Sequence, residues 1–95
     1  MTTRITKYTS QFKRDYNCEK RSGLYQNLDG ELLSIIKLLA TDNSLPLNKR
    51  DHTLRDNRRN YRECHIKSDL ILIYRKPDNS SLELVRLGSH SKLNL

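Results

Sequence analysis

Three short runs of strand-forming residues within residues 61–90 constrain the fold more than any other part of the chain. The first run, residues 61–66, alternates along its length, which is typical of a strand with two different faces. The second, residues 70–74, is apolar throughout, as expected of a central strand buried on both faces. The third, residues 82–87, follows a proline-containing turn. Because the connections between the runs are short, we expect antiparallel neighbours in one sheet.

The start of the chain is expected to form one strand and one helix. Residues 4–9 are short and β-prone, which predicts a strand. Thr9 or Ser10 is placed to cap a helix that follows at once. Gly23 carries the usual signal for the end of that helix.

A second helix is predicted over residues 24–41. Its apolar side chains recur at spacings of four, three and four, which marks one helical face: Leu28, Leu32, Ile35 and Leu39. Gly30 is unfavourable inside a helix, so a start at this point with Asp29 as the cap is an alternative. Either start leaves a wide apolar stripe for packing.

Residues 43–60 show neither a helical nor a strand period. A structureless segment of this length is uncommon in a compact domain and is often functional. The segment contains His52 and a run of charged residues, which is either a solvated loop or a surface for a polyanion. Its basic side chains are Lys49, Arg50, Arg55, Arg58 and Arg59.

The expected order of elements is β-α-α-β-β-β, with the helices before most of the strands. This segregation predicts the α+β class, with two helices packed on one face of a small, mostly antiparallel sheet. The other face of the sheet, with the basic segment beside it, is left for function. A length of 95 residues suits one domain spanning residues 1–95.

The chain is strongly basic. Lysine and arginine number 18 against 11 acidic residues, a formal net charge of +7. An excess of this size favours a polyanion or an acidic protein as partner. The N-terminus lacks the pattern of a signal peptide, and no apolar run approaches the roughly 20 residues that span a bilayer. We therefore expect a cytoplasmic protein without membrane contact.

Groups that transfer protons or bind phosphate stand at the ends of the predicted strands. They are Glu63, His65, Asp69, Arg86 and His90, with His52 in the basic segment. Histidine titrates near neutral pH, so two histidines can act as base and acid in one reaction, as RNA cleavage requires. An arginine can steady the phosphate charge through its forked guanidinium. Each residue also has an ordinary alternative role, as a strand end, a turn former or an ion-pair partner.

A metal site is not expected. The cysteines and histidines show none of the spacings of a zinc site, and the adjacent Cys64 and His65 point to opposite faces of a strand. A glycine-rich phosphate loop and a GxSxG nucleophile elbow are also absent. We therefore expect neither a metal nor a cofactor.

Three motifs together resemble a known family. They are Asp51-His52-x-Leu54, then Tyr61-Arg62-Glu63-Cys64-His65-Ile66-Lys67-x-Asp69-x-Ile71-Leu72-Ile73-Tyr74, and finally Leu87-Gly88-Ser89-His90. In combination they are similar to the YafQ family, small toxins of bacterial type II toxin–antitoxin modules within the RelE/ParE superfamily. The motifs cover about half of the chain, and the expected order of helices and strands matches across the rest.

The resemblance implies a RelE-like fold and an endoribonuclease that cleaves mRNA in the A site of the translating ribosome, beside 16S rRNA, without a metal. The catalytic positions that it implies are His52, His65, Asp69, His90, Glu63 and Arg86. We expect the basic segment and Tyr61 to contact RNA. The resemblance also implies a cognate antitoxin that wraps the toxin, which is a monomer alone and part of a heterotetramer or larger assembly with the antitoxin.

Two positions depart from the family pattern. Leu70 stands where an aromatic residue often follows the aspartate, and Leu93-Asn94 stand where a phenylalanine often follows the last histidine. Stacking of a base on an aromatic ring contributes roughly 1–3 kcal/mol. We therefore expect an altered codon preference or activity.

Two other functional classes fit parts of the sequence. A non-enzymatic toxin resembling ParE, which inhibits DNA gyrase by binding, has no need of the histidines. A basic RNA-binding module without chemistry would keep its binding after the loss of every histidine.

Overall fold

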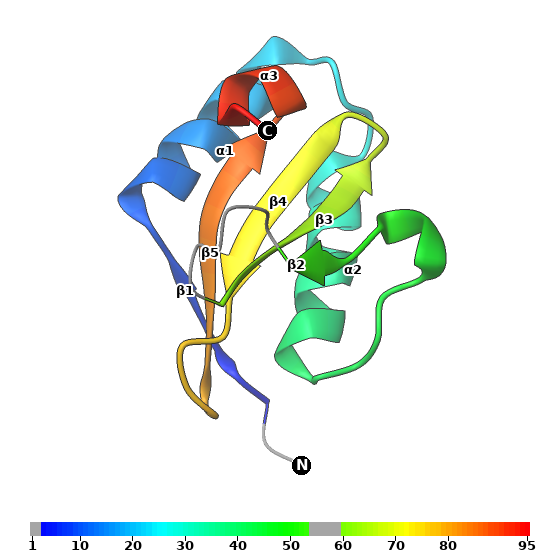
Figure 1. Ribbon diagram of the computed structural model, residues 1–95. Helices are drawn as coiled ribbons and strands as arrows, with labels where there is room; N and C mark the ends of the chain where they lie inside the picture. The colour runs from blue at the N-terminus through cyan, green and yellow to red at the C-terminus, as the bar shows by residue number, and fades with distance from the viewer. Residues whose placement is uncertain (1–2, 54–59) are drawn as a thin grey trace.

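The computed structural model describes residues 3–53 and 60–95 (Figure 1). Within these residues the chain forms a five-stranded sheet with two long helices on one side. In chain order the elements are β1 (Ile5–Tyr8), α1 (Ser10–Ser22), α2 (Leu28–Ala40), the 3₁₀ helix η1 (Leu47–Lys49), β2 (His52–Thr53), β3 (Tyr61–Lys67), β4 (Leu70–Arg75), β5 (Ser81–Gly88) and α3 (His90–Leu93).

The strands lie side by side in the order β1-β5-β4-β3-β2. Every neighbouring pair is antiparallel except β1 and β5, which are parallel. A parallel neighbour needs a crossover connection, and α1 and α2 provide it because both lie between β1 and the other strands along the chain. The predicted α+β class with a mostly antiparallel sheet is confirmed.

The core fills the space between the sheet and the pair α1 and α2 (Figure 1). Side chains of both layers are buried there, among them Phe12, Leu28, Leu32, Ile35, Leu39, Cys64, Ile66, Leu72, Tyr74, Leu82, Leu84 and Leu87. Along β3 the alternation is as predicted, because Cys64 and Ile66 face the helices. Their neighbours Glu63 and His65 therefore lie on the opposite face.

Local signals set the ends of α1. The Thr9 side chain accepts a hydrogen bond from the backbone N–H of Phe12 at 3.0 Å, which satisfies one of the free donors of the first turn. Gly23 follows the helix with a φ of 68°, a conformation that glycine adopts without a steric penalty. Both predicted signals are confirmed. None of the helices in the described part of the chain is long and apolar enough to cross a membrane.

The second helix starts later than its apolar pattern predicts. α2 begins at Leu28, with Asn27 as the residue before it, so the predicted start at residue 24 is wrong. The alternative with Asp29 as the cap is wrong as well, because Asp29 lies inside the first turn. Leu24 is 76% exposed, whereas Leu28 is buried. Burial of an apolar face supplies most of a helix's stability in a protein, and it begins only at Leu28.

The segment predicted to lack structure contains two short elements. Residues 47–49 form η1, and His52–Thr53 form β2, which pairs with β3 at the edge of the sheet. The prediction of a structureless segment over residues 43–60 is therefore wrong for these parts. A strand of two residues is too short to show a period of two in the sequence.

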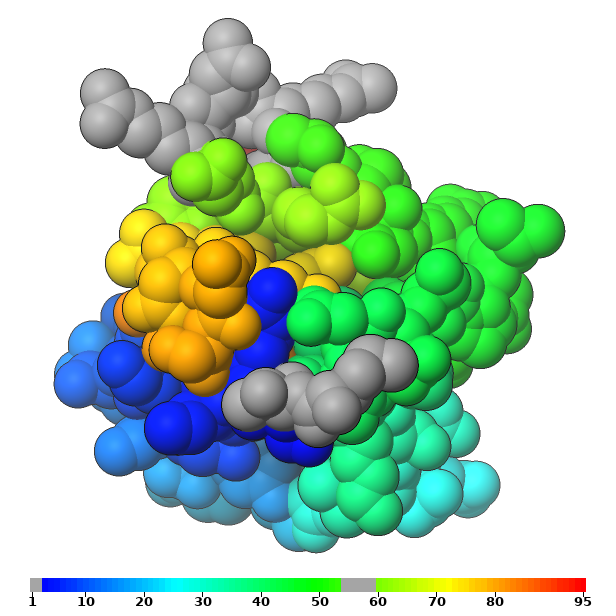
Figure 2. Space-filling model, turned by 90° about the horizontal axis from the view of Figure 1, so that it is seen from below, coloured from blue at the N-terminus to red at the C-terminus, as the bar shows by residue number. Residues whose placement is uncertain are grey.

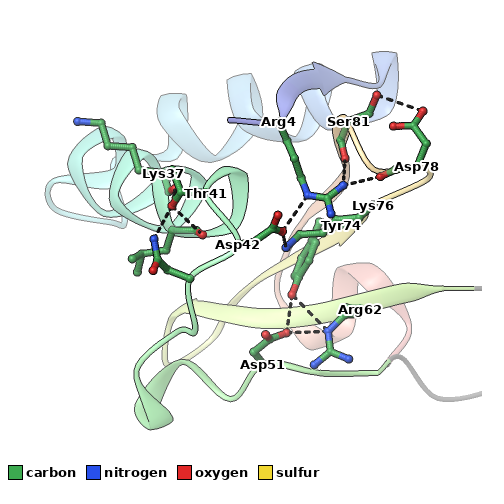
Figure 3. A network of polar contacts seen from close by, with 12 residues as sticks. Arg4, Lys37, Thr41, Asp42, Asp51, Arg62, Tyr74, Lys76, Asp78 and Ser81 are labelled. Atoms are coloured by element: carbon green, nitrogen blue, oxygen red, sulfur yellow. Dashed lines mark hydrogen bonds and ion pairs between the residues drawn. The ribbon is translucent and has the colours of Figure 1, made fainter. Parts of the chain in front are cut away.

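Arg4 joins three segments at the end of the molecule seen in Figure 2, where the start of β1 (blue) lies between the β4–β5 turn (orange) and the end of α2 (green). Its guanidinium bonds to the carboxylate of Asp42 at 2.8 Å and to the carbonyls of Asp78 and Ser81 (Figure 3). Lys76 contacts the same Asp42 carboxylate at 2.7 Å. These contacts fasten the edge strand β1 to the turn and to α2.

Candidate active site

The sheet face turned away from α1 and α2, here called the open face, carries Tyr61, Glu63, His65, Ile71 and Ile73. The cross-strand register brings most of the predicted site residues into two neighbouring rows on it. The first row, from β2 to β5, is His52, Glu63, Ile73 and Arg86. The second row, from β3 to β5, is His65, Ile71 and Gly88. Residues far apart in sequence are thus held on one rigid surface.

His52 and Glu63 form a direct pair across β2 and β3. The imidazole Nε2 lies 2.9 Å from Oε1 of Glu63. Glu63 is only 8% exposed, whereas half of the His52 side chain is open to solvent. Because a buried carboxylate requires a partner, Glu63 orients the imidazole, whose other nitrogen, Nδ1, lies 3.1 Å from the carbonyl oxygen of Thr53.

His65 and His90 lie against each other. Their ring centroids are 5.5 Å apart and the ring planes are tilted by 56°. His65 is buried, and its Nδ1 lies 3.2 Å from the carbonyl oxygen of Ser68. A carbonyl can only accept, so this hydrogen bond places a proton on Nδ1 and leaves Nε2 of a neutral ring as an acceptor. The tautomer that results is one that can take a proton from a substrate.

Asp69 adds a carboxylate beside His90. It lies in the tight turn between β3 and β4, and its Oδ1 is 3.5 Å from Nδ1 of His90. The turn is held from the helical side by Tyr25, whose hydroxyl donates to the Asp69 carbonyl at 3.4 Å. Asp69 is thus placed to orient the His90 imidazole.

The short helix α3 determines where His90 lies. The Ser89 side chain caps it by accepting from the backbone N–H of Lys92 at 3.2 Å. Leu93 is buried against Ile71 on the open face, and Nζ of Lys92 lies 2.7 Å from the buried carboxylate of Glu19 on α1. These contacts dock α3 on both the sheet and α1, so His90 stands on a fixed element.

Arg86, predicted to bind phosphate, is paired with a carboxylate of α1. Its Nε lies 2.7 Å from Asp15, which also accepts from the backbone N–H of Leu87 at 3.0 Å. Burial raises the pKa of Asp15, but the hydrogen bonds from Arg86 and Leu87 outweigh it and lower that pKa below its ordinary value. Arg86 therefore lies in the first row with part of its charge neutralised.

The predicted RNA-binding residues have different environments. Lys49 points inward, where its Nζ lies 3.1 Å from the Ile66 carbonyl and 3.4 Å from the carboxylate of Glu31. Arg50 is exposed, and the Tyr61 ring lies 5.4 Å from the guanidinium carbon of Arg75. Three further predictions fall outside the described residues: Arg55, Arg58 and Arg59.

The two departures from the family's aromatic positions contain two buried leucines, Leu70 and Leu93, and the exposed Asn94. Leu70 is fully buried in the core beneath the helices. Leu93 is part of α3, and its side chain packs against the open face. A residue at position 70 of this chain therefore contributes to packing and does not present a surface to a base. The expected loss of base stacking at Leu70 does not follow from this fold.

Several residues around the site escaped sequence reasoning because their partners are distant in the chain. Asp15 and Glu19 on α1 hold Arg86 and Lys92, respectively. Asp51 and Tyr74, which the family motifs contain but to which no role was assigned, interact beneath the sheet. Cys64 is excluded as a nucleophile, because burial raises the pKa of its thiol to about 12.

An apolar hollow of about 520 Å³ lies on the helical side of the molecule. Its lining comes from β1, α1 and α2 and includes Tyr8, Phe12, Tyr16, Leu33 and Ile36. The hollow and the histidines therefore belong to opposite faces of the sheet. The open face remains the place where ionisable groups gather.

Metal binding receives no geometric support from the described residues. Among residues 3–53 and 60–95, no three side chains of histidine, cysteine, aspartate or glutamate approach closely enough to hold an ion together. The open-face groups instead form two pairs, His52 with Glu63 and His90 with Asp69. The absence of a metal and of a cofactor stays a prediction.

Solved structures of bacterial toxins share this fold. The chain superposes on YafQ in the Escherichia coli DinJ-YafQ complex with a TM-score of 0.83 at 28% identity, covering 95% of this chain and 97% of that chain. It superposes on a metal-bound toxin from Helicobacter pylori with a TM-score of 0.82 at 36% identity, covering 98% and 99%. The fold thus defines a RelE-like bacterial toxin.

The sequence comparisons narrow this class to one family. Residues 4–95 match the family described as "Bacterial toxin of type II toxin-antitoxin system, YafQ". A relative named "mRNA interferase toxin YafQ", from Escherichia coli (strain B / BL21-DE3), is 32% identical over 95 residues and covers 98% of both chains. The chain belongs to the YafQ family of type II toxin–antitoxin toxins.

Proposed function

We propose that this toxin is an mRNA endoribonuclease that acts in the ribosomal A site by acid–base catalysis without a metal. The observation that carries the proposal is the gathering of three histidines and two carboxylates on the open face of one sheet and at its adjoining end, where Asp69 and His90 lie. The Escherichia coli relative named as an mRNA interferase supports the choice of substrate. A rigid sheet holds catalytic groups in the narrow range of geometries that such chemistry needs.

The proposed reaction needs one base, one acid and one cation. The base removes the proton of a 2′-hydroxyl, and the oxygen attacks the adjacent phosphorus while the bond to the 5′-oxygen breaks. The acid gives a proton to that leaving oxygen, so the products are a 2′,3′-cyclic phosphate and a 5′-hydroxyl. Proton transfers of this kind contribute typically 10²–10⁴-fold each to the rate.

The open face supplies all three roles. His65 and His90 are close enough to act on one phosphodiester, and Asp69 orients His90. Glu63 orients His52 as a third ionisable group of the same surface. We propose Arg86, held in place by Asp15, as the cation that stabilises the developing charge on the phosphate.

RNA and ribosome binding are assigned to the basic segment that contains His52 and to Tyr61. Arg50 is exposed two residues before His52, and Tyr61 lies on the open face with Arg75 over its ring. The predicted roles of Arg55, Arg58 and Arg59 are kept as part of this proposal. A formal charge of +7 favours contact with 16S rRNA as well as with mRNA.

We further propose that a cognate antitoxin holds this toxin inactive in the cytoplasm. The support is the likeness to YafQ as it occurs in the DinJ-YafQ complex. The toxin is then a monomer alone and part of a heterotetramer or larger assembly with its antitoxin. Co-expression with the neighbouring reading frame, followed by sizing of the complex, tests this part of the proposal.

The catalytic proposal is tested with His90→Ala and Asp69→Ala. Each is expected to reduce mRNA cleavage at least 100-fold and to relieve growth arrest, because proton transfer or its orientation is lost. Cleavage is mapped by primer extension on a translated and an untranslated copy of one mRNA, with and without EDTA. Asp29→Asn, which changes an exposed aspartate on the helical side, is the matched control and keeps full activity.

Three outcomes would contradict parts of the proposal. If both variants stay as toxic as the parent, the catalytic assignment is wrong. Cleavage of the untranslated mRNA argues against ribosome dependence, and loss of cleavage in EDTA with the ribosomes intact argues against the metal-free mechanism. Gyrase-dependent DNA breaks with intact transcripts identify the ParE-like class instead.

A further inference from the structure

Beneath the His52–Glu63 pair, on the helical side of the sheet, lies a second set of polar contacts. Oδ1 of Asp51 accepts a hydrogen bond from the Tyr74 hydroxyl at 2.5 Å and another from Nε of Arg62 at 3.1 Å (Figure 3). Nε of Arg62 is also 3.3 Å from the Tyr74 oxygen. Three residues from three segments thus meet at one carboxylate oxygen.

The guanidinium of Arg62 reaches both neighbours of His52. Its Nε bonds to Asp51, and its Nη1 donates to the Thr53 hydroxyl at 3.2 Å. In a strand the residues before and after a given position point to the face opposite to it. Contacts that fix Asp51 and Thr53 on the helical side therefore turn the His52 side chain toward Glu63 on the open face.

Pairing between β2 and β3 is too limited to fix this orientation alone. In the described part of the chain β2 consists of two residues, both exposed, so few ladder hydrogen bonds hold it there. Tyr74, in contrast, is 1% exposed in the core, where burial together with the hydrogen bond to Asp51 raises the pKa of its hydroxyl. The contacts of Asp51 and Arg62 therefore link a weak edge strand to the most rigid part of the molecule.

We infer that Arg62, Asp51 and Tyr74 are positioning residues that aim His52 at the reacting phosphate. The inference rests on the proposed function, because it assigns these residues to a step in which His52 takes part. The three bond to one another on the helical side of the sheet, so their effect on cleavage passes through His52. Arg62 has the central place, because it is bonded to the residue on either side of the histidine.

The test uses Arg62→Lys, which keeps the positive charge but loses the fork that contacts two partners. Single-turnover cleavage on programmed ribosomes is expected to fall 10- to 100-fold at saturation, because small displacements of a catalytic group have effects of this size. The ribosome concentration for half-maximal rate is expected to change less than about threefold, since charge is retained. Tyr74→Phe removes one hydroxyl from the same contacts and is expected to reduce the rate less.

Two measurements separate positioning from a merely structural role. In a His52→Ala background, Arg62→Lys is expected to have no further effect on the rate, because residues that act through one another are not additive. In NMR spectra of the free toxin, Arg62→Lys is expected to shift the imidazole signals of His52 and to leave those of His65 and His90 in place. Tyr16→Phe, which removes a similar hydroxyl–carboxylate bond on α1, is the control and changes neither measurement.

The inference is overturned if Arg62→Lys lowers the rate by the same factor with and without His52. It is also overturned if the His52 imidazole signals do not change in Arg62→Lys and Tyr74→Phe. The NMR measurement needs no RNA, so it decides the positioning of His52 even if the parent toxin cleaves no transcript and the proposed function fails.

Discussion

The carboxylate of Asp15 contributes both to the fold and to the candidate site. It accepts from the backbone N–H of Leu87, along the part of β5 that extends beyond its pairing with β1, and it holds the guanidinium of Arg86. The edge of a strand presents free N–H groups that otherwise require water or another strand. Asp15 satisfies one of these N–H groups from α1. It also holds the guanidinium of Arg86, which lies in the same row of the sheet as His52.

The lowered pKa of Asp15 predicts a pH-dependent contribution to stability. A carboxyl group whose pKa is depressed in the folded state stabilises the protein above its unfolded pKa, and this stability is lost as pH falls through the folded pKa. Asp15→Asn is expected to lower the free energy of unfolding by about 1–2 kcal/mol at pH 7 and by less below about pH 4. Urea unfolding at pH 7, 5 and 3 measures the difference.

The control for this prediction is Asp29→Asn. Asp29 also has a lowered pKa, caused by hydrogen bonds from Lys20 and Tyr16, but it lies on the surface and solvent screens its contacts. Its replacement is expected to change stability little at any of these pH values. A stability difference for Asp15→Asn that stayed constant down to pH 3 would contradict the assignment.

Two short elements carry two of the three histidines. β2 has two residues and bears His52, and α3 has four residues and precedes the end of the chain with His90 at its start. Neither length is stable alone, because a single helical turn or an isolated strand pair gains too little to offset the lost chain entropy. Each is held by side chains of other elements: Arg62 and Tyr74 for β2, Glu19 for α3.

Because the contact between Lys92 and Glu19 docks α3, we expect substitutions of these two residues to have coupled effects on stability. Lys92→Met leaves the buried Glu19 carboxylate without this cation, and we expect a loss of about 1–3 kcal/mol in stability together with reduced mRNA cleavage. The double variant Lys92→Met, Glu19→Gln removes the unpaired charge and is expected to recover part of the stability. Thermal unfolding and cleavage assays of the single and double variants test this, and simple additivity would speak against the pairing.

At the scale of the whole molecule, the sheet separates two surfaces. The helical side, where α1 and α2 pack (Figure 1), carries the apolar hollow lined by both helices. The open face carries the histidines and carboxylates. The net charge of +7 acts over the entire molecule, because unlike a hydrogen bond it needs no fixed geometry. In the proposed function, charge brings the toxin to RNA and the open face then acts on one phosphate.

The salt dependence of RNA binding is expected to distinguish two neighbouring cations, Arg50 and Lys49. Arg50 is exposed, so Arg50→Ala is expected to weaken RNA binding and to reduce the slope of log K against log salt by about one contact. Lys49 is bonded internally to Ile66 and Glu31, so Lys49→Ala is expected to reduce stability and to leave the slope nearly unchanged. Fluorescence anisotropy with a short RNA at several salt concentrations measures both slopes.

Local patterns in the sequence were sufficient for most of the architecture. The alternation along residues 61–66, the apolar run of residues 70–74 and the caps at Thr9 and Gly23 each predict an element that the structure contains. These predictions succeeded because strand period, helix period and helix caps depend on residues within a few positions of one another. The candidate site residues were predicted from strand ends and from three motifs with a family resemblance, also local in the chain, and their roles stay a prediction.

Only the tertiary structure decided which of these residues meet. The pairing of His52 with Glu63 depends on a two-residue strand, too short to be seen as a pattern. The contact of His65 with His90, and the bond between Arg86 and Asp15, join residues separated by whole elements. Leu70 is a further example. The family pattern suggested this position for base stacking, but the structure buries it in the core. Such contacts depend on strand register and on the docking of α1 and α3, which are set by packing of the whole chain.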